Sequence, residues 1–382
     1  MAGNVSPLRV LFKAAIIFAA FNILFASLNF PVGKFTAYNF LFPGRLRFPY
    51  EREPSLYPVG YNAPLFEDFD AMFGSHVISD GEKPAGEFRV ILLGDSATWG
   101  GHLPASENLA EQINRLALQT CDGRRVHAYN LAFPWPFSFR DLLILDEAMK
   151  YQPDEVLWLV TLSTFDRQNV EMEFLRPHAD RALRLIDRYD LDLPWLARRL
   201  DSPSFWDKTI VGQRARLNKI ARAQLYGLLW AATGIDFHVT RVPVNPQPPS
   251  PDVRRDAAYF GFSSAQELPR LLDTLTLSDI AAAVQIAGDV PVVVVNEPVF
   301  IAAGENSDLR YNNNYPRWAY DAYRETIAEY ASARGYEFYD FWNTIPANEF
   351  LNPALHRSPA GERRFAEILV PVIAQAACPF QP

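Results

Sequence analysis

Residues 88–100 read FRVILLGDSATWG and carry the clearest indication of the fold. The first six residues form a largely apolar run rich in branched side chains, which is typical of a parallel strand buried on both faces. The run ends at Gly94-Asp95-Ser96, so a serine hydroxyl follows the strand on a tight turn. Apolar residues at helical spacing over 107–120 then predict a helix.

Strand and helix patterns alternate on both sides of a long interruption. Further strands are predicted over 126–131, 155–162, 291–296 and 336–341, and further helices over 140–150, 316–334 and 359–377. This alternation predicts an α/β fold, a doubly wound parallel sheet with right-handed crossovers. Residues 87–382 are expected to form this domain. Helical stretches around 181–200, 205–230 and 265–286 predict a helical insertion or cap over about 167–288.

Composition narrows the class of protein. The 382 residues are 49% hydrophobic and 21% charged, which excludes a disordered chain. A net charge of −8 argues against a nucleic-acid partner held by phosphate neutralisation. Only two cysteines are present, Cys121 and Cys378, which excludes a disulfide-dense scaffold and paired CxxC zinc knuckles. The two thiols either form one bridge, if the domain lies outside the membrane, or stay free.

The N-terminus carries a membrane signal. Residues 14–30, AAIIFAAFNILFASLNF, follow Arg9 and Lys13, and residues 10–32 are long enough to cross a bilayer as a helix. Phe25-Ala26-Ser27 is a poor cleavage site, so we favour an uncleaved signal anchor at 1–33 over a cleaved signal or a soluble helix. Basic residues flank both ends of the run and leave the orientation open. Residues 34–86, rich in Pro, Gly, Tyr and Phe, predict an extended stalk partly packed on the domain.

A serine on a turn at a helix start favours nucleophilic chemistry, because the helix N-terminus stabilises a developing negative charge. The alternative is an ordinary helix cap, since Asp95 and Ser96 are both good capping residues. A serine needs a base, and His356, on a loop before the last helix, is the natural candidate, with His102 as a rival. No HxH or HExxH pattern occurs, so neither a catalytic metal nor a cofactor is expected.

These blocks resemble the SGNH (GDSL-like) hydrolase and acyltransferase superfamily. The likeness rests on GDSATWG at 94–100, on Asn130 after the second strand, and on His356 with Ser358 and Gly361 before the last helix. It implies a flavodoxin-like three-layer α/β/α sandwich. It also implies ester chemistry with Ser96 as nucleophile and His356 as base.

The chain departs from the family pattern beside the histidine. The family carries an aspartate three residues before it, where this chain has Pro353. Asn352 is the nearest polar residue and is expected to hold the ring tautomer, although an amide stabilises imidazolium less than a carboxylate does. Asp340, at the end of the last strand, is the alternative orienting group.

A second departure concerns the oxyanion site. The family uses the serine N–H, a glycine N–H after the second strand and an asparagine side chain after the third. Trp135 lies near the expected glycine, and Ser163 or Thr164 stands where the asparagine is expected. Gly94 and Asp95 are counted with this site. Asn130 has two interpretations of equal weight, a catalytic role or a structural bond to the GDS turn.

Asn296 and Glu297 end the fourth strand and are predicted to face the same crevice as Ser96. With the amides and aromatic residues at 304–318 they favour a sugar acceptor, against the interpretation of an ordinary Asx-rich loop. The basic run at 214–222, RARLNKIAR, is interpreted as a solvated helix face rather than a lipid-headgroup patch.

The sequence therefore predicts a single-pass cell-membrane protein with an extracytoplasmic serine esterase or O-acyltransferase domain, acting on an acyl ester of a cell-surface glycan. Whether a membrane-embedded acyltransferase is its partner is left open. The competing hypothesis is a catalytically inactive glycan-binding or scaffold protein with the same fold. Hydrolysis and transfer share one acyl-enzyme, so the sequence does not separate them.

Overall fold

The protein is described from a computed structural model, which covers residues 6–28, 32–33, 68–191, 193–234 and 249–378. Five parallel strands form one sheet in the order β2-β1-β3-β4-β5. The strands are β1 (Glu87–Leu93), β2 (Arg125–Asn130), β3 (Glu155–Val160), β4 (Val292–Asn296) and β5 (Glu337–Asp340). This is the flavodoxin-like strand order, in which the carboxyl ends of all strands lie at one edge.

Helices cover both faces of the sheet, so the domain is the expected α/β/α sandwich. One core joins the sheet to α5 (Ser138–Ala148), α12 (Ser278–Ala287) and α13 (Arg317–Ser332). The other joins it to α4 (Leu109–Arg115) and α14 (Pro359–Ala377). Side chains alternate along each strand. Ile91 of β1 therefore points into the first core and Leu92 into the second.

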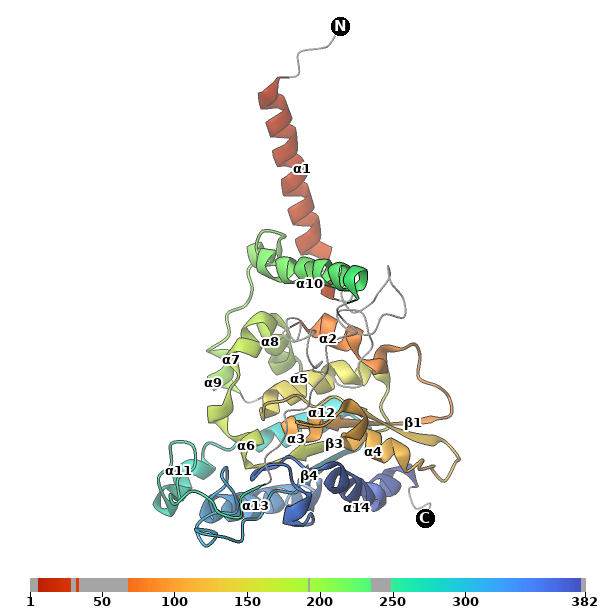
Figure 1. Cartoon of the computed structure of the whole chain (residues 1–382). Coiled ribbons are helices and arrows are strands. Elements are labelled where there is room, and N and C mark those ends of the chain that lie inside the picture. The colour runs from red at the N-terminus through yellow and green to blue at the C-terminus, as the bar shows by residue number, and fades with distance from the viewer. Residues whose placement is uncertain (1–5, 29–31, 34–67, 192, 235–248, 379–382) are drawn as a thin grey trace.

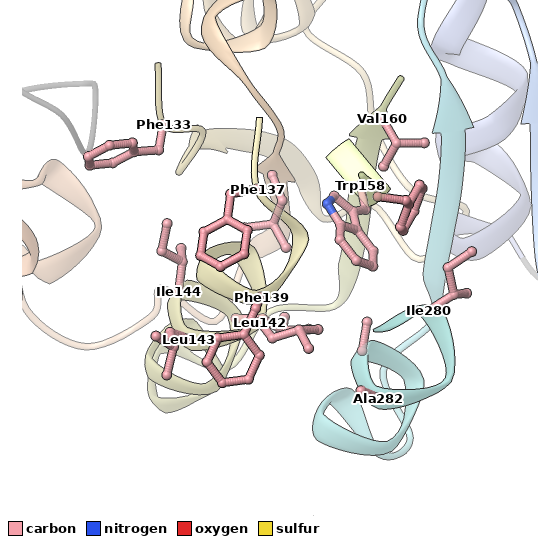
Figure 2. Close-up of a cluster of buried hydrophobic side chains, with 14 of the residues drawn as sticks. Phe133, Phe137, Phe139, Leu142, Leu143, Ile144, Trp158, Val160, Ile280 and Ala282 are labelled. Carbon is pink, nitrogen blue, oxygen red and sulfur yellow. The ribbon is translucent and has the colours of Figure 1, made fainter. Parts of the chain in front are cut away.

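The first core is dense in aromatic residues. Figure 2 shows Trp158 and Val160 of β3 facing Ile280 and Ala282 of α12, with Phe137, Phe139 and Leu142 around the start of α5. Trp158 is fully buried, and its indole N–H donates to a carboxylate oxygen of Asp141 over 3.0 Å. The indole N–H is thereby satisfied inside the core.

The long segment between β3 and β4 is mostly helical but more broken than the sequence predicts. The expected helix over 181–200 is α8 (Ala179–Arg188) followed by α9 (Pro194–Ala197). Asp190 lies between them with a left-handed backbone (φ 48°), and Pro194 occupies the first turn of α9. A left-handed residue ends one helix, and a proline suits the start of the next. The helix expected over 205–230 is η8 (Trp206–Lys208) and α10 (Arg214–Thr233).

The remaining elements are short. They are α2 (Phe69–Ser75), η3 (Val77–Ser79), α3 (Ser96–Trp99), η4 (Ala105–Glu107), η5 (Met149–Tyr151), α6 (Leu162–Phe165), η6 (Arg167–Asn169), α7 (Met172–Leu175), η7 (Arg176–His178), η10 (Ala265–Glu267), α11 (Leu268–Leu272) and η11 (Ala347–Glu349).

The N-terminal helix α1 (Pro7–Leu28) stands away from the sandwich, and α10 lies crosswise near its lower end (Figure 1). Its 22 residues are long and apolar enough to cross a membrane, and little of the helix is buried. Most of the expected stalk, residues 34–67, lies outside the described residues. Residues 68–79 pack as α2 and η3, with Phe69, Met72 and Phe73 in the first core.

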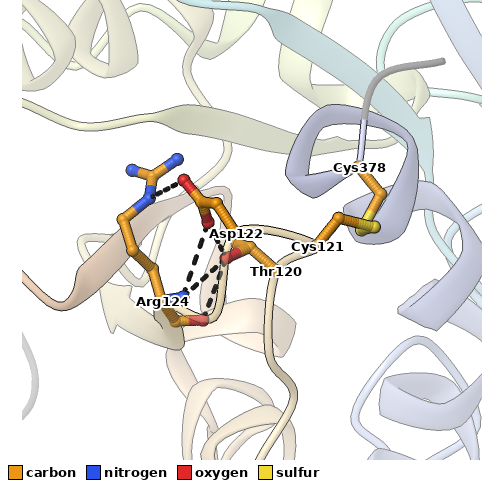
Figure 3. The surroundings of a disulfide bond; sticks show 5 residues. All are labelled: Thr120, Cys121, Asp122, Arg124 and Cys378. Atoms are coloured by element: carbon orange, nitrogen blue, oxygen red, sulfur yellow. Dashed lines mark hydrogen bonds and ion pairs between the residues drawn. A yellow bond between two sulfur atoms is a disulfide. The ribbon is translucent and has the colours of Figure 1, made fainter. Parts of the chain in front are cut away.

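Cys121 and Cys378 form a disulfide, which settles the alternative left open by the sequence. Figure 3 shows the bond joining the segment after α4 to the end of α14. The backbone N–H of Cys121 also donates to the carbonyl of Ala377 over 3.4 Å. The bond therefore ties together two elements that are 257 residues apart in sequence.

Candidate active site

The turn after β1 presents Ser96. An added Cβ at Gly94 would lie 2.7 Å from Oγ1 of Thr98 and 3.0 Å from the carbonyl oxygen of Leu159, so only glycine fits there. Asp95 caps α3, because its Oδ1 accepts from the backbone N–H of Ala97 over 2.8 Å. The capping role thus belongs to Asp95. The Ser96 hydroxyl is left for another contact, and the residue is only partly buried.

That contact is His356. The Oγ of Ser96 lies 2.9 Å from Nε2 of His356, although the two residues are 260 positions apart in sequence. His356 sits on the loop before α14, whose first turn is set by Ser358, which accepts from the N–H of Gly361 over 3.2 Å, and by Pro359. The fold therefore brings the end of the first strand and the start of the last helix together at one edge of the sheet.

Gly101 makes room for the imidazole, and sequence reasoning missed it. An added Cβ at this position would lie 2.8 Å from Nε2 of His356 and 3.1 Å from the carbonyl oxygen of Ser96. Its N–H donates to that same carbonyl over 2.8 Å, which closes the turn after α3. The only signal in the sequence is a second glycine directly after the GDSATWG block.

Asn352 contacts the other ring nitrogen, and its amide has a defined orientation. Its Oδ1 accepts from the backbone N–H groups of Ala354, Leu355 and His356, each over 3.2 Å. The NH2 group therefore faces Nδ1 of His356 and donates to it. A neutral imidazole that accepts at Nδ1 carries its proton on Nε2. Asn352 thus holds the tautomer in which His356 donates to Ser96.

The surroundings of His356 disfavour its protonated form. Burial lowers the pKa of His356 to about 4, with further lowering by His102 and Arg357. His102 meets the His356 ring edge-on, with ring centroids 4.8 Å apart and an interplanar angle of 89°. It is held there by a left-handed backbone (φ 70°), which is uncommon for a residue with a side chain. His102 therefore packs beside the His356 ring.

A buried layer of ionisable groups adjoins His356. Arg357 is fully buried between Glu297, 2.8 Å away, and Glu362, 3.2 Å away. Burial raises the pKa of Glu297 to about 8 and that of Glu362 to about 7, and burial also raises the pKa of Asp95. Arg357 directly follows His356 in the chain. Its ion pairs with Glu297 and Glu362 therefore hold the loop that carries the histidine. Arg357 and Glu362 carry no signal in the sequence beyond a charge at a position near His356.

Asn130 has the contacts of the structural interpretation. Its NH2 group donates to the carbonyls of Thr98 and Trp99 over 3.0 and 3.2 Å, and its Oδ1 accepts from the N–H of Ala132 over 3.1 Å. Each end of the amide is therefore engaged with backbone. Asn130 ties the end of β2 to the helix that carries Ser96.

The residues proposed for the oxyanion site have other contacts. Thr164 Oγ1 accepts from the N–H of Thr161 at the start of α6, and the hydroxyl of Tyr315 donates to Ser163 Oγ over 3.1 Å. Trp135 is half exposed, with its ring 5.9 Å from that of Phe133. These contacts engage Ser163 with Tyr315 and Thr164 with the first turn of α6.

Asn296 and Asp340 belong to a second network. The Asn296 NH2 group donates to Asp340 over 2.8 Å, and its Oδ1 accepts from the hydroxyl of Tyr320 over 3.2 Å. Asp340 also pairs with Arg324 over 2.7 Å. Asn296 and Glu297 are fully buried, so neither presents a side chain to solvent in the crevice. Asp340 is engaged away from His356, and Asn352 is the group on the ring.

No cluster of three or more His, Cys, Asp or Glu side chains that could hold a metal ion occurs among the described residues. The candidate site therefore consists of Ser96 and His356, which contact each other and are both partly open to solvent at the carboxyl edge of the sheet.

Comparisons with known proteins give a distant structural likeness. No protein-family model matches the chain, and no curated protein sequence matches it. Among solved structures, the chain is similar to one described as the lipase/acylhydrolase from Enterococcus faecalis, at 14% sequence identity and a TM-score of 0.38. The match covers 77% of this chain and 99% of that one. A likeness this distant assigns no activity, which has to be argued from the geometry of the site.

Proposed function

We propose that the protein is a membrane-anchored serine esterase or O-acyltransferase, with Ser96 as nucleophile and His356 as general base. The observation that carries the proposal is the 2.9 Å contact between Ser96 Oγ and His356 Nε2. A serine and an imidazole within hydrogen-bond reach are the minimal unit of nucleophilic acyl transfer. Their partial exposure leaves the hydroxyl open to a substrate carbonyl.

The reaction follows from the proton positions. Ser96 Oγ attacks the ester carbonyl, and its proton passes to Nε2 of His356 in the tautomer that carries the other proton on Nδ1. The resulting imidazolium returns the proton to the leaving alcohol as the acyl-enzyme forms. Water then gives hydrolysis, and an acceptor hydroxyl gives transfer. The resting tautomer set by Asn352 has to rearrange first, so we expect a slow enzyme.

The turn also supplies an oxyanion donor. The backbone N–H of Ser96 is the first of α3, a position that has no acceptor within its own helix. It is the natural donor to the oxygen of a tetrahedral intermediate. A second donor would come from the backbone after β2. The N–H of Phe133 already donates to the carbonyl of Gly94, so the next candidate is the N–H of Trp135, two residues later.

Two features support a membrane-tethered, extracytoplasmic location. Helix α1 is long and apolar enough to span a bilayer. The Cys121–Cys378 disulfide is typical of an oxidising compartment rather than the cytosol. A surface glycan ester would suit such an enzyme, and the half-exposed indole of Trp135 offers a face on which a sugar ring could pack.

One observation favours the second candidate, a non-catalytic scaffold or glycan-binding protein. The Asn352 NH2 group faces Nδ1 of His356 and opposes the proton position that a general base needs. In this alternative, the Ser96–His356 contact is only a structural hydrogen bond.

Ester hydrolysis by the purified full-length chain in detergent separates the two. With p-nitrophenyl acetate, we expect turnover that Ser96→Ala abolishes and that Ser202→Ala, a matched change at an exposed serine, leaves unchanged. Folded wild-type protein with no turnover above the Ser96→Ala variant would support the scaffold. Adding glycan acceptors then separates transfer from hydrolysis.

A further inference from the structure

The structure places a helix with exposed arginines and leucines beside the proposed membrane span. Figure 1 shows α10 crosswise to α1, between that helix and the sandwich. The loop before α10 contacts α1 directly, because the backbone N–H of Val211 donates to Oδ1 of Asn22 over 3.2 Å. Asn22 and Ala26 are the buried residues of α1, so the contact lies near its C-terminal end.

The position of Asn22 sets the depth of this contact. From Pro7 to Asn22 a helix rises about 23 Å, and to Leu28 about 32 Å. A hydrocarbon layer of about 30 Å therefore needs nearly all of α1, and Asn22 lies inside its boundary. Val211, bonded to Asn22, would lie at a similar depth in a bilayer. Two aromatic side chains of the same loop, Phe205 and Trp206, are exposed, and Trp206 is 72% exposed.

Helix α10 has two different sides. At 3.6 residues per turn, Arg214, Arg222, Leu225 and Leu229 fall within about 80° of one another, and all four are exposed. The opposite side carries Arg216, which pairs with Asp68 and Asp70 of the sandwich, and the buried Ile220.

The inner side of α10 does not pack on an apolar core. It borders a cavity of about 590 Å3 that is lined mostly by charged and polar side chains, among them Asp68, Arg184, Arg216 and Lys219. Turning α10 about its axis would therefore bring the exposed Leu225 and Leu229 against charged and polar side chains, not against an apolar core. The outer side thus presents two arginines followed by two leucines, and the neighbouring loop presents two aromatic side chains at the end of the membrane span. This combination is expected of a helix that lies at the boundary between lipid headgroups and acyl chains.

We propose that η8, the following loop and the outer side of α10 (residues 205–229) form a platform that lies in the surface of an anionic lipid bilayer. Leu225, Leu229 and Trp206 enter the acyl boundary, and Arg214 and Arg222 contact lipid phosphates. The inference rests on the proposed anchoring by α1. It adds that the domain is held against the bilayer rather than on a free tether. Arg214 and Arg222, the two ends of the basic run at 214–222, are then lipid contacts rather than part of the solvated face expected from the sequence, while Arg216 of the same run pairs with the sandwich.

Depth-dependent fluorescence quenching tests this with the full-length chain in nanodiscs of phosphatidylcholine and phosphatidylglycerol. Single cysteines replace Leu225 or Leu229 on α10, Phe12 on α1, and Glu367 on α14, which lies far from α1 (Figure 1). Each is labelled with an environment-sensitive dye, and the native cysteines stay in their disulfide. Nitroxide lipids report contact with the bilayer, and iodide reports contact with water.

We expect shallow nitroxide lipids to quench the labels at 225 and 229 several-fold, deep nitroxide lipids to quench the label at 12, and neither to quench the label at 367. Quenching at 12 alone, with iodide reaching 225 and 229, would overturn the platform and leave the anchoring intact. Labels at 225 and 229 shielded from both lipid and iodide would show a protein partner or a second copy, and would also overturn it. No quenching at 12 would overturn the anchoring and this proposal together.

Discussion

The NH2 group of Asn352 faces Nδ1 of His356, so the imidazole presents its own N–H to Ser96. Three backbone N–H groups on Oδ1 hold the amide in this orientation. Turning it over would break those three bonds and set donors against donors, which is costly in a partly buried site. A carboxylate at position 352 would accept on both oxygens and remove the conflict.

Asn352→Asp is therefore expected to raise the esterase activity proposed for this site. One oxygen keeps the three backbone bonds and the other accepts from Nδ1–H, which releases Nε2 to take the serine proton. Replacing the carboxylate of a Ser-His-Asp triad with an amide costs about 10⁴-fold in kcat, so the reverse change should raise kcat/KM by at least about tenfold. Steady-state hydrolysis of p-nitrophenyl acetate measures it, and an unchanged or lower rate would contradict the tautomer assignment.

The same pair of proteins should differ in pH dependence. The base acts only when neutral, and its pKa of about 4 keeps it neutral down to that pH. The acidic limb of kcat/KM in the wild type should therefore lie near pH 4, well below the ordinary histidine value. In Asn352→Asp the new carboxylate stabilises the imidazolium, so the limb should move to higher pH. Identical limbs in the two proteins would mean that His356 is not the titrating group.

Gly101→Ala is expected to reduce activity through His356. The new methyl group would lie 2.8 Å from Nε2 of His356 and 3.1 Å from the carbonyl oxygen of Ser96, so the ring has to leave its present position beside Ser96. Gly101 has no left-handed backbone, so the substitution adds no backbone strain and acts through these contacts. We expect kcat to fall at least about tenfold, since small displacements of catalytic groups are costly.

Gly86→Ala is the matched control for this change, because its added Cβ meets nothing within 4 Å. Both variants should unfold at nearly the wild-type temperature. Full activity in Gly101→Ala would show that the histidine needs no such clearance.

Glu155 should make the protein less stable at alkaline pH. It is fully buried at the start of β3, neither carboxyl oxygen has a hydrogen-bond partner among the described residues, and burial and Glu337 raise its pKa to about 9. Between pH 4.5 and 9 the folded state holds a proton that the unfolded state has lost. The free energy of unfolding therefore falls as pH rises, by up to about 1.4 kcal/mol per unit.

Glu155→Gln should remove this contribution. Urea unfolding at pH 5.5 and 8.5 should show similar stabilities at the lower pH and a more stable variant at the higher pH. The exposed Glu82→Gln serves as control. A wild-type protein whose stability declines with pH exactly as the variant's does would refute the assignment.

Loss of the disulfide should lower the free energy of unfolding and leave the contact between Ser96 and His356 intact. The bond closes a loop of 257 residues, and removing a native disulfide typically costs 2–5 kcal/mol. Cys378 lies at the far end of α14 from His356, so the site should survive in the folded state. The double variant Cys121→Ser/Cys378→Ser should melt at a lower temperature yet retain its rate at low temperature. A variant that stays folded at low temperature but loses its rate would tie the bond to the site.

The sheet was predictable because buried parallel strands are continuous apolar runs. All five strands were expected within about two residues of their observed bounds, and α14 at its observed bounds, because Ser358-Pro359 marks a helix start. Helices in the insertion were less predictable. The amphipathic pattern over 181–200 continues through Asp190 and Pro194. The sequence therefore does not show that the helix is interrupted there, where the structure has a left-handed residue and a new helix start.

The site was predictable only in part. The turn at Ser96 and the loop at His356 are local features with sequence signatures, and the fold brings them together. The roles of Gly101, Arg357 and the Asn352 amide depend on contacts between distant segments, which leave no periodic or spacing signal. Asn296 and Glu297 were expected in the crevice because they end a strand, but the tyrosines of α13 and Arg357 cover them.

Labelling with a fluorophosphonate, followed by peptide mass spectrometry, tests most directly whether Ser96 and His356 act together. We expect an adduct on Ser96 in the wild type, none in Ser96→Ala, a weaker one in His356→Ala and a stronger one in Asn352→Asp. Folded wild-type and Asn352→Asp proteins that both carry no adduct on Ser96, or carry it on another serine, would contradict it.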